Sequence, residues 1–192
     1  AGAAHLAIRA KHPSLLTIIA PRHPERADTI AGDLTAMGLT VARRSKNEPI
    51  SGTTDVYLAD TVGELGTWFA ASAITFMGKS LAKDGGGHNP IEPIKLASTV
   101  ITGPSWHNFD DFYKALLAAH AALEVKNGDE LAEAIGRLLS SPEDLGIIKS
   151  NAERCIAAMG GALAKSLETI LALLPPPAPR RQQATQEAAI AP

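Results

Sequence analysis

Short apolar runs alternate with amphipathic segments along most of the chain. Runs rich in β-branched residues predict buried strands, and apolar positions spaced three and four apart predict helices. The strands are expected at residues 15–20, 40–42, 56–58, 74–77, 99–101 and 122–125. The helices are expected at residues 25–37, 64–71, 90–96, 108–119, 128–139 and 142 to about 174, where Gly160 and Gly161 offer a break. Strands that alternate with helices predict an α/β fold, a parallel sheet with helices on both faces.

The organisation of the chain follows from its length and from a change in composition near its end. Its 192 residues are enough for one domain with a substantial core, which we expect to span residues 1–174. In residues 175–192 Pro, Gln and Ala dominate without apolar periodicity, so we expect a disordered tail. Residues 1–10 have the pattern of a helix end, and no Met precedes them. We therefore expect a fragment of a longer protein.

Charge and cysteine content exclude several classes of protein. The net charge of −2 and the mixture of both signs argue against a nucleic-acid partner. The single cysteine, Cys155, excludes an internal disulfide and fits a reducing compartment. No apolar run approaches the length of a membrane span, and no signal peptide is visible.

A glycine-rich loop that leads into a helix is the most informative feature of the sequence. Gly85, Gly86 and Gly87 are followed by His88 and then by Asn89, a residue type that caps helices. Glycines let a ligand approach the backbone, and a helix N-terminus directs free N–H groups at an anion. The carboxylate of the nearby Glu92 can accept hydrogen bonds from hydroxyl groups. This combination is typical of nucleotide and sugar-nucleotide sites.

The same stretch has a structural alternative. Asn89 and Glu92 have the spacing of a capping box, in which the acid accepts a hydrogen bond from the cap residue's own N–H. Residues 61–64, 127–130 and 141–144 have a similar spacing, and we expect at least the last two only to start helices. The preceding glycines favour a functional role for Glu92, because a plain helix start does not require them.

Two further candidate loops follow expected strands, where parallel sheets bind their ligands. Arg22 follows the first strand between two prolines, and its planar guanidinium suits a phosphate or a carboxylate. An equal alternative is that Arg22 pairs with a local acid or caps a helix end. In the second loop Gly63 allows close approach of a ligand, whereas Thr61 and Glu64 have the spacing of a helix cap and its partner. Lys79 adds positive charge beside the glycines, or is simply solvated.

The other polar and aromatic candidates favour structural roles. His88 can hydrogen-bond a ligand, but a bond to the loop backbone is the preferred interpretation. Trp106, His107 and Phe109 either wall a pocket or cover the core, and we prefer the second. No metal-ligand spacing includes His88, and no Ser/His/Asp or Cys/His set is apparent. We therefore expect no metal, no cofactor and no catalytic residue in this chain.

The motifs together have the order and spacing of one family. They are Pro21-Arg22-His23-Pro24-Glu25-Arg26, Val62-Gly63-Glu64-Leu65, Gly86-Gly87-His88-Asn89-Pro90-Ile91-Glu92-Pro93, and Gly103-Pro104 followed by Asn108-Phe109. Over about residues 5–172 the chain resembles the C-terminal half of the 3-deoxy-D-manno-octulosonic acid (Kdo) transferases of lipopolysaccharide synthesis. The ordered set is more specific than any single motif, since glycine-rich loops followed by Glu occur throughout the GT-B glycosyltransferases. One departure is Lys79, where relatives usually have a second glycine.

The resemblance implies a GT-B architecture of two Rossmann-like domains, with this chain as the C-terminal domain that binds CMP-Kdo. The residues that it implies for contact with the cytidine nucleotide are Pro21, Arg22, Val62, Gly63, Glu64, Asn89, Pro90, Ile91 and Glu92. In this family the catalytic base and the lipid A acceptor site belong to the N-terminal domain. Since that domain is not in this chain, we expect the fragment alone to be inactive.

The function implied by the resemblance is transfer of Kdo from CMP-Kdo to a lipid A precursor. The implied partners are the CMP-Kdo donor, the N-terminal acceptor domain and, through that domain, the lipid A precursor. The parent protein is expected at the cytoplasmic face of the bacterial inner membrane, and the fragment is expected to be soluble. Two alternatives stay open, a UDP-sugar-using GT-B transferase or epimerase domain and a nucleotide-binding module without chemistry.

Overall fold

The computed structural model describes residues 1–160 together with residues 169 and 173. Residues 1–158 form one compact unit. The expected domain end at residue 174, the expected tail and the helix expected beyond Gly160 lie outside the described residues, except for residues 169 and 173.

In the described part of the chain, six short strands form two parallel sheets. The first sheet has the order β1-β3-β2 and contains β1 (Thr17–Ile19), β3 (Val56–Leu58) and β2 (Val41–Arg43). The second has the order β4-β5-β6 and contains β4 (Ile74–Phe76), β5 (Thr99–Thr102) and β6 (Leu123–Glu124). All pairings are parallel, and Ile19 and Arg43 both lie opposite Leu58. The predicted parallel α/β fold is confirmed, although its strands make two ladders rather than one.

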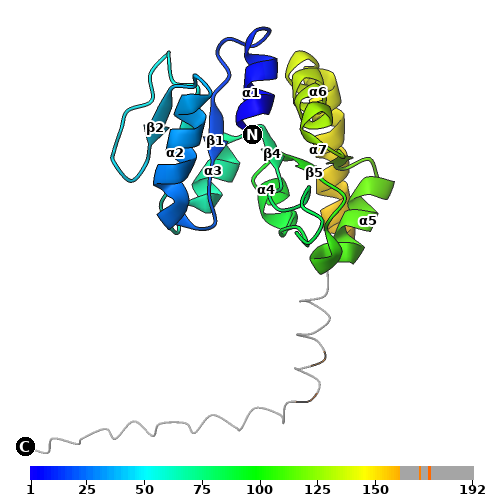
Figure 1. The fold of residues 1–192 in the computed structure, drawn as a ribbon. Helices are drawn as coiled ribbons and strands as arrows, with labels where there is room; N and C mark the ends of the chain where they lie inside the picture. The colour runs from blue at the N-terminus through cyan, green and yellow to red at the C-terminus, as the bar shows by residue number, and fades with distance from the viewer. Residues whose placement is uncertain (161–168, 170–172, 174–192) are drawn as a thin grey trace, which may run out of the picture. The chain divides into compact units, whose positions relative to one another are not determined.

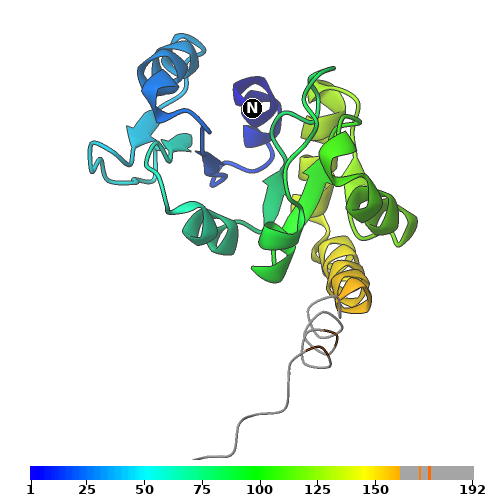
Figure 2. The ribbon, with the colours of Figure 1, turned by 90° about the horizontal axis from the view of Figure 1, so that it is seen from below.

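Helices flank both sheets. They are α1 (Gly2–Arg9), α2 (Ala27–Ala36), α3 (Leu65–Ala71), α4 (Ile91–Lys95), α5 (Asp110–Ala118), α6 (Gly128–Ser140) and α7 (Pro142–Met159). Short 3-10 turns at Pro24–Arg26 and His107–Phe109 precede α2 and α5, so the two predicted helices there begin with a tighter turn. Figures 1 and 2 show α2 beside the first sheet, and α5, α6 and α7 gathered beside the second.

The predicted start of α6 and the predicted end of α2 are both confirmed. The Oδ1 atom of Asn127 accepts hydrogen bonds from the backbone N–H groups of Asp129 and Glu130, at 3.0 and 2.9 Å. The carboxylate of Glu130 in turn accepts a bond of 2.8 Å from the N–H of Lys126, the residue before the cap, and so helps to fix the helix start. Gly38 follows α2 with φ +80°, the left-handed conformation that glycine adopts without strain.

Helix α1 connects the first sheet to the rest of the unit. It packs against α6, and its His5 is only 2% exposed. The ring of His5 lies 2.9 Å from the hydroxyl of Thr17 and 3.3 Å from Oδ1 of Asp55, at the amino ends of β1 and β3. A hydrogen bond from the N–H of Thr40 lowers the pKa of Asp55, with a smaller contribution from His5. This polar cluster lies at the edge of the sheet opposite to the candidate loops.

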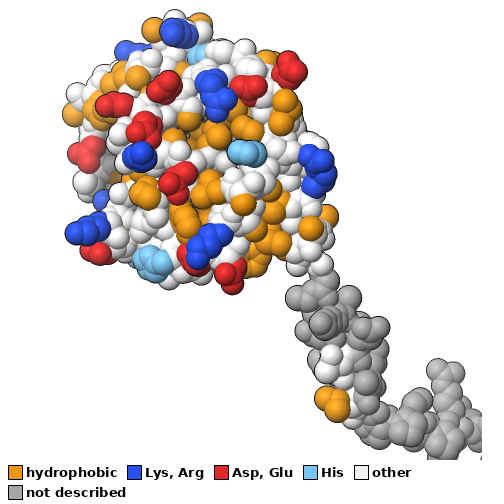
Figure 3. Space-filling view, turned by 90° about the vertical axis from the view of Figure 1, so that its right-hand side faces the viewer, with side chains coloured by type: hydrophobic (Ala, Val, Ile, Leu, Met, Phe, Trp, Pro, Cys, Tyr) orange, Lys and Arg blue, Asp and Glu red, His pale blue; other side chains and the backbone are white. Residues whose placement is uncertain are grey.

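Charges of both signs are distributed over the surface. Figure 3 shows the face formed by α5, α6 and α7, on which Lys, Arg, Asp and Glu side chains are interspersed with apolar ones. No helix in the described part of the chain is long and apolar enough to cross a membrane.

Candidate functional site

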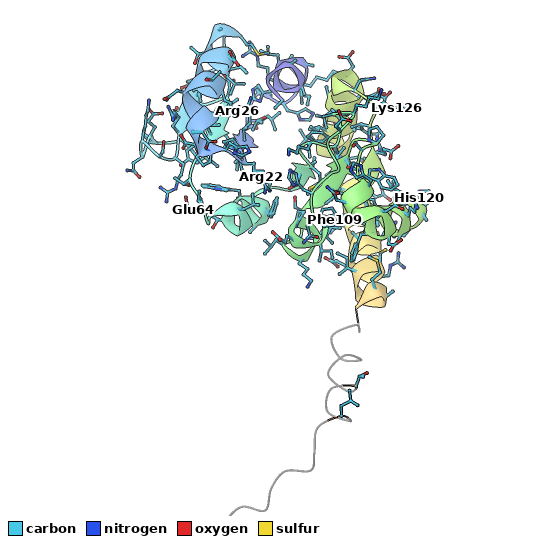
Figure 4. All side chains as sticks on the ribbon, turned by 60° about the horizontal axis from the view of Figure 1, so that its bottom comes forward. Arg22, Arg26, Glu64, Phe109, His120 and Lys126 are labelled. Atoms are coloured by element: carbon cyan, nitrogen blue, oxygen red, sulfur yellow. The ribbon has the colours of Figure 1, made fainter. Side chains whose placement is uncertain are left out.

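The loops that follow β1 and β3 leave the first sheet from the same edge. The two strands are parallel neighbours, so their carboxyl ends lie together. Arg22 follows β1 directly; it is exposed and has no ion-pair partner among the described residues. The alternative in which Arg22 pairs with a local acid is therefore wrong for this structure. Figure 4 shows Arg22 and Glu64 on these two loops.

The loop after β3 exposes its backbone at residues 62–64. Val62 is 85% exposed, and Gly63 has φ +90° with open space where a side chain would stand. Within the described part of the chain, the N–H groups of Val62, Gly63 and Glu64 donate no hydrogen bond. Successive free N–H groups around a left-handed residue form a concave surface that suits an anion.

The side chain of Glu64 is bound within the protein. The guanidinium of Arg44 donates to both carboxylate oxygens, at 3.0 Å from Nε to Oε2 and 2.8 Å from Nη2 to Oε1. The hydroxyl of Thr61 donates to the same carboxylate. The bond from Arg44, followed by that from Thr61, lowers the pKa of Glu64. The predicted helix cap is wrong: α3 starts after Glu64 without a side-chain cap, and the ion pair fixes the loop instead.

A buried ion pair between Asp60 and Arg43 fixes the position of this loop. Asp60 is 5% exposed, and its Oδ2 lies 2.9 Å from Nε of Arg43 at the end of β2. Ser45 donates to Asp60 through its N–H at 2.8 Å and through its hydroxyl at 2.7 Å. Burial raises the pKa of Asp60, but the bonds from Ser45 and Arg43 outweigh it, and the net shift is downward. The sequence gives no signal for this pair, since the partners are distant along the chain and follow no local pattern.

The glycine-rich loop after β4 packs tightly against the protein. An added Cβ would lie 1.4 Å from the carbonyl oxygen of Lys79 at Gly85, and 2.3 Å from Nδ2 of Asn108 at Gly86. At Gly87 it would lie 3.0 Å from Cα of Trp106. Gly86 and Gly87 also have φ near +73° and +72°. Internal packing therefore accounts for all three glycines, so the role expected of Glu92 has to be argued from its own position.

Three hydroxyl groups anchor the same loop. The buried Ser80 accepts a bond of 2.7 Å from the N–H of Gly103, and Ser105 accepts one of 3.1 Å from the N–H of Gly86. Tyr113 of α5 donates a bond of 2.8 Å to the backbone carbonyl of His88. Burial raises the pKa of Tyr113 to about 12, so this hydroxyl stays a donor at neutral pH. Each of these three hydrogen bonds joins residues that are distant in sequence, so the local pattern of residue types does not indicate them.

Asn89 and Glu92 do not form the predicted capping box. Asn89 accepts a bond of 3.0 Å from the N–H of Ile91, as a cap does, but α4 begins only at Ile91. Glu92 is thus the second helical residue rather than the third, and its carboxylate makes only a 3.5 Å contact with the amide of Asn89. The exposed carboxylate of Glu92 is left available to a ligand. Because α4 has five residues, its dipole contributes little to anion binding.

The ring of His88 is not bonded to the loop backbone, contrary to the preferred interpretation. It makes no hydrogen bond with any described residue, and Tyr113 holds its carbonyl instead. Partial burial lowers the pKa of His88, and the positive charges of Arg22 and Lys79 lower it further. The charge of Arg22, on the loop after β1, therefore acts on His88 in the loop after β4.

The aromatic cluster after β5 mainly covers the core, which is the interpretation preferred from the sequence. Trp106 stacks on Tyr113 with 5.8 Å between ring centroids, and its Nε1 donates to Glu124 at 2.9 Å. Phe109 packs with Trp106 against the same buried cluster. A hollow of about 430 Å³ also borders Trp106, His107 and neighbouring residues of the glycine-rich loop. Another, of about 620 Å³, lies between α2 and β2, away from the loops after β1 and β4.

Metal binding receives no support from side-chain clustering. In the part of the chain that the structure describes, no group of three or more His, Cys, Asp or Glu residues is placed to hold a metal ion.

Known proteins resemble this chain in sequence and in structure, although no family model matches it. It is 37% identical over 167 residues to the 3-deoxy-D-manno-octulosonic acid transferase of Haemophilus influenzae, covering 86% of this chain and 39% of that protein. Identity to the transferase of the same name from Bordetella pertussis is 36% over 163 residues, 84% of this chain and 38% of that protein. The C-terminal CMP-Kdo binding domain of WaaA from Acinetobacter baumannii matches with a TM-score of 0.77 and 32% identity, over 80% of each chain.

Parallel strands, flanking helices and polar loops at the carboxyl ends define a Rossmann-like domain, the C-terminal half of a GT-B fold. The chain spans about two fifths of the length of the curated relatives it matches. It belongs to the Kdo transferase family, in which it corresponds to the C-terminal domain. The predicted resemblance is confirmed.

Proposed function

We propose that this chain binds the donor CMP-Kdo through the loops that follow β1, β3 and β4. The observation that carries the proposal is the likeness to a solved CMP-Kdo binding domain, at 32% identity and a TM-score of 0.77. The residues proposed to contact the nucleotide are Pro21, Arg22, Val62, Gly63, Glu64, Asn89, Pro90, Ile91 and Glu92.

Each loop offers the donor a different kind of group. The guanidinium of Arg22 is exposed and unpaired among the described residues, and its planar set of N–H donors suits the phosphate. The free N–H groups at residues 62–64 can donate further hydrogen bonds to the same phosphate. Glu92 presents an exposed carboxylate that can accept hydrogen bonds from adjacent ribose hydroxyls. Glu64 contributes through the position of its loop, since Arg44 and Thr61 already bind its carboxylate.

The role of this domain in the reaction is to stabilise the leaving group. When the bond between the sugar's anomeric carbon and the phosphate breaks, negative charge grows on the phosphate of CMP. Fixed donors such as Arg22 stabilise that charge more in the transition state than in the bound donor.

The remaining steps belong to the whole protein. We propose that an N-terminal acceptor domain presents a lipid A precursor, whose hydroxyl attacks the sugar and loses its proton to a base of that domain. The whole protein would act at the cytoplasmic face of the inner membrane, where such a lipid precursor is available.

Calorimetric titration with CMP and with UMP tests the proposed donor. CMP should bind, and UMP should bind at least about ten-fold more weakly, because a base site that pairs with the amino group of cytosine leaves a polar group unsatisfied when uracil enters. Equal affinity for the two nucleotides would contradict a CMP-specific site and favour a UDP-sugar donor.

A further inference from the structure

Lys79 has a backbone conformation that is unfavourable for a lysine. Its φ is +63°, in the left-handed region that a side chain makes costly. Three other non-glycine residues of the described chain have positive φ, and each has an ordinary reason. Asn47 is of a type that tolerates this region, whereas Ala97 and His120 follow the ends of α4 and α5, where a left-handed residue terminates the helix. Lys79 follows a strand and has neither reason.

The packing of the glycine-rich loop fixes Lys79 in this conformation. Its carbonyl oxygen occupies the space where a side chain on Gly85 would begin, 1.4 Å from the position of that Cβ. The side chain itself is exposed, and none of the described residues forms an ion pair or a hydrogen bond with it. The fold thus fixes the backbone of Lys79, while none of the described residues pairs with its ammonium group.

Two other basic side chains belong to the surroundings of Lys79. The ring of His88 lies near Gly78, the neighbour of Lys79 in the chain, since a Cβ added to Gly78 would lie 4.0 Å from Cδ2 of the ring. The charges that act on His88 are those of Arg22 from the loop after β1 and Lys79 from the loop after β4, and both are positive. From α5, Tyr113 reaches the backbone of His88 as a neutral hydroxyl. Arg22 and Lys79 are both exposed and have no ion-pair partner among the described residues, and two such cations on the loops of one site create a positive potential that favours an oxyanion.

We propose that Lys79 binds an oxyanion of the donor together with Arg22, and that the His88 ring is a third donor to it. The inference rests on the proposed function and assigns to that site a cation beyond the residues named there. The oxyanion is the phosphate of the nucleotide or the carboxylate of the sugar. A nucleotide that lacks the sugar separates these two sources.

The test compares Lys79→Gly and Lys79→Asn with the parent chain. Both replacements remove the charge and accept the left-handed backbone, so thermal unfolding should occur at the parent temperature or above it. Calorimetry at low ionic strength should show CMP binding weakened about five-fold, the effect of one partly screened charge pair. The difference should shrink as salt is added. Cytidine, which has no phosphate, should bind equally to all three proteins.

Lys83→Asn is the matched control, because Lys83 is an exposed lysine of the same loop. It should bind CMP as the parent does. Loss of affinity for CMP-Kdo but not for CMP would support the proposal with the carboxylate as the oxyanion. If Lys79→Gly binds CMP and CMP-Kdo as tightly as the parent at low salt, Lys79 has no such role. A parent chain that binds no CMP would overturn the proposed function itself, which is a different result.

Discussion

Replacing Asp60 by Asn should lower the free energy of unfolding by about 3 kcal/mol. Asp60 is 5% exposed and paired with Arg43 at 2.9 Å, and its replacement leaves the largely buried charge of Arg43 with only the exposed Asp28 as a partner. The fold should survive, but the loop of residues 59–64 should lose its fixed position. Urea denaturation of Asp60→Asn and the parent measures the loss directly.

Asp28→Asn is the control for this prediction, because Asp28 binds the same guanidinium from an exposed position. Its side chain is 85% exposed, so solvent screens the interaction and only a small fraction of the Asp60 effect is expected. Equal losses for the two variants would show that burial of the Asp60 pair has no special importance.

The same pair predicts a dependence on pH. The pKa of Asp60 is lowered from its ordinary value of 3.8 in the folded protein, so acid favours the unfolded state. The stability that Asp60 contributes should therefore be present above pH 3.8 and should be lost as the pH falls through the lower, folded pKa. Asp60→Asn should remove this part of the acid dependence.

Replacing Glu92 by Gln should weaken CMP binding about ten- to a hundred-fold while the fold is retained. Hydrogen bonds to a charged acceptor commonly contribute about 1.5–3 kcal/mol, which corresponds to that range in affinity. Glu92 is exposed and, among the described residues, makes no hydrogen bond shorter than the 3.5 Å contact with Asn89, so stability should change little. Calorimetry with CMP and thermal unfolding measure the two effects separately.

Glu130→Gln is the matched control, since Glu130 has the same spacing from an asparagine but its carboxylate accepts a backbone hydrogen bond, from the N–H of Lys126 at the start of α6. It should bind CMP as the parent does. If Glu92→Gln keeps the parent affinity for CMP, Glu92 does not bind the ribose.

The sequence predicts the elements of this fold well because each follows from a local pattern. The run at residues 56–58 and the cap at Asn127 need no distant partner to be recognised. The neighbours of each strand are not local, so the placement of β3 between β1 and β2 was not predicted.

The internal contacts of the candidate site were not predicted. Asn89 and Asn127 precede glutamates at the same spacing, yet α4 starts one residue later, after Pro90, and only Glu130 accepts a hydrogen bond from a backbone N–H at the start of its helix. Gly86 and Gly87 resemble ligand-binding glycines, but their packing against Trp106 and Asn108 depends on tertiary structure. Nothing in the sequence pattern pairs Arg43 with Asp60 either.

Hydrogen–deuterium exchange of the chain with and without saturating CMP tests the central claim most directly. The account predicts slower exchange at residues 20–23, 59–64 and 77–92, the loops at the carboxyl ends of β1, β3 and β4. Exchange beside the hollow between α2 and β2, and in the cluster around His5, should stay unchanged. Protection confined to either of those regions, with the three loops unaffected, would contradict the proposed donor site.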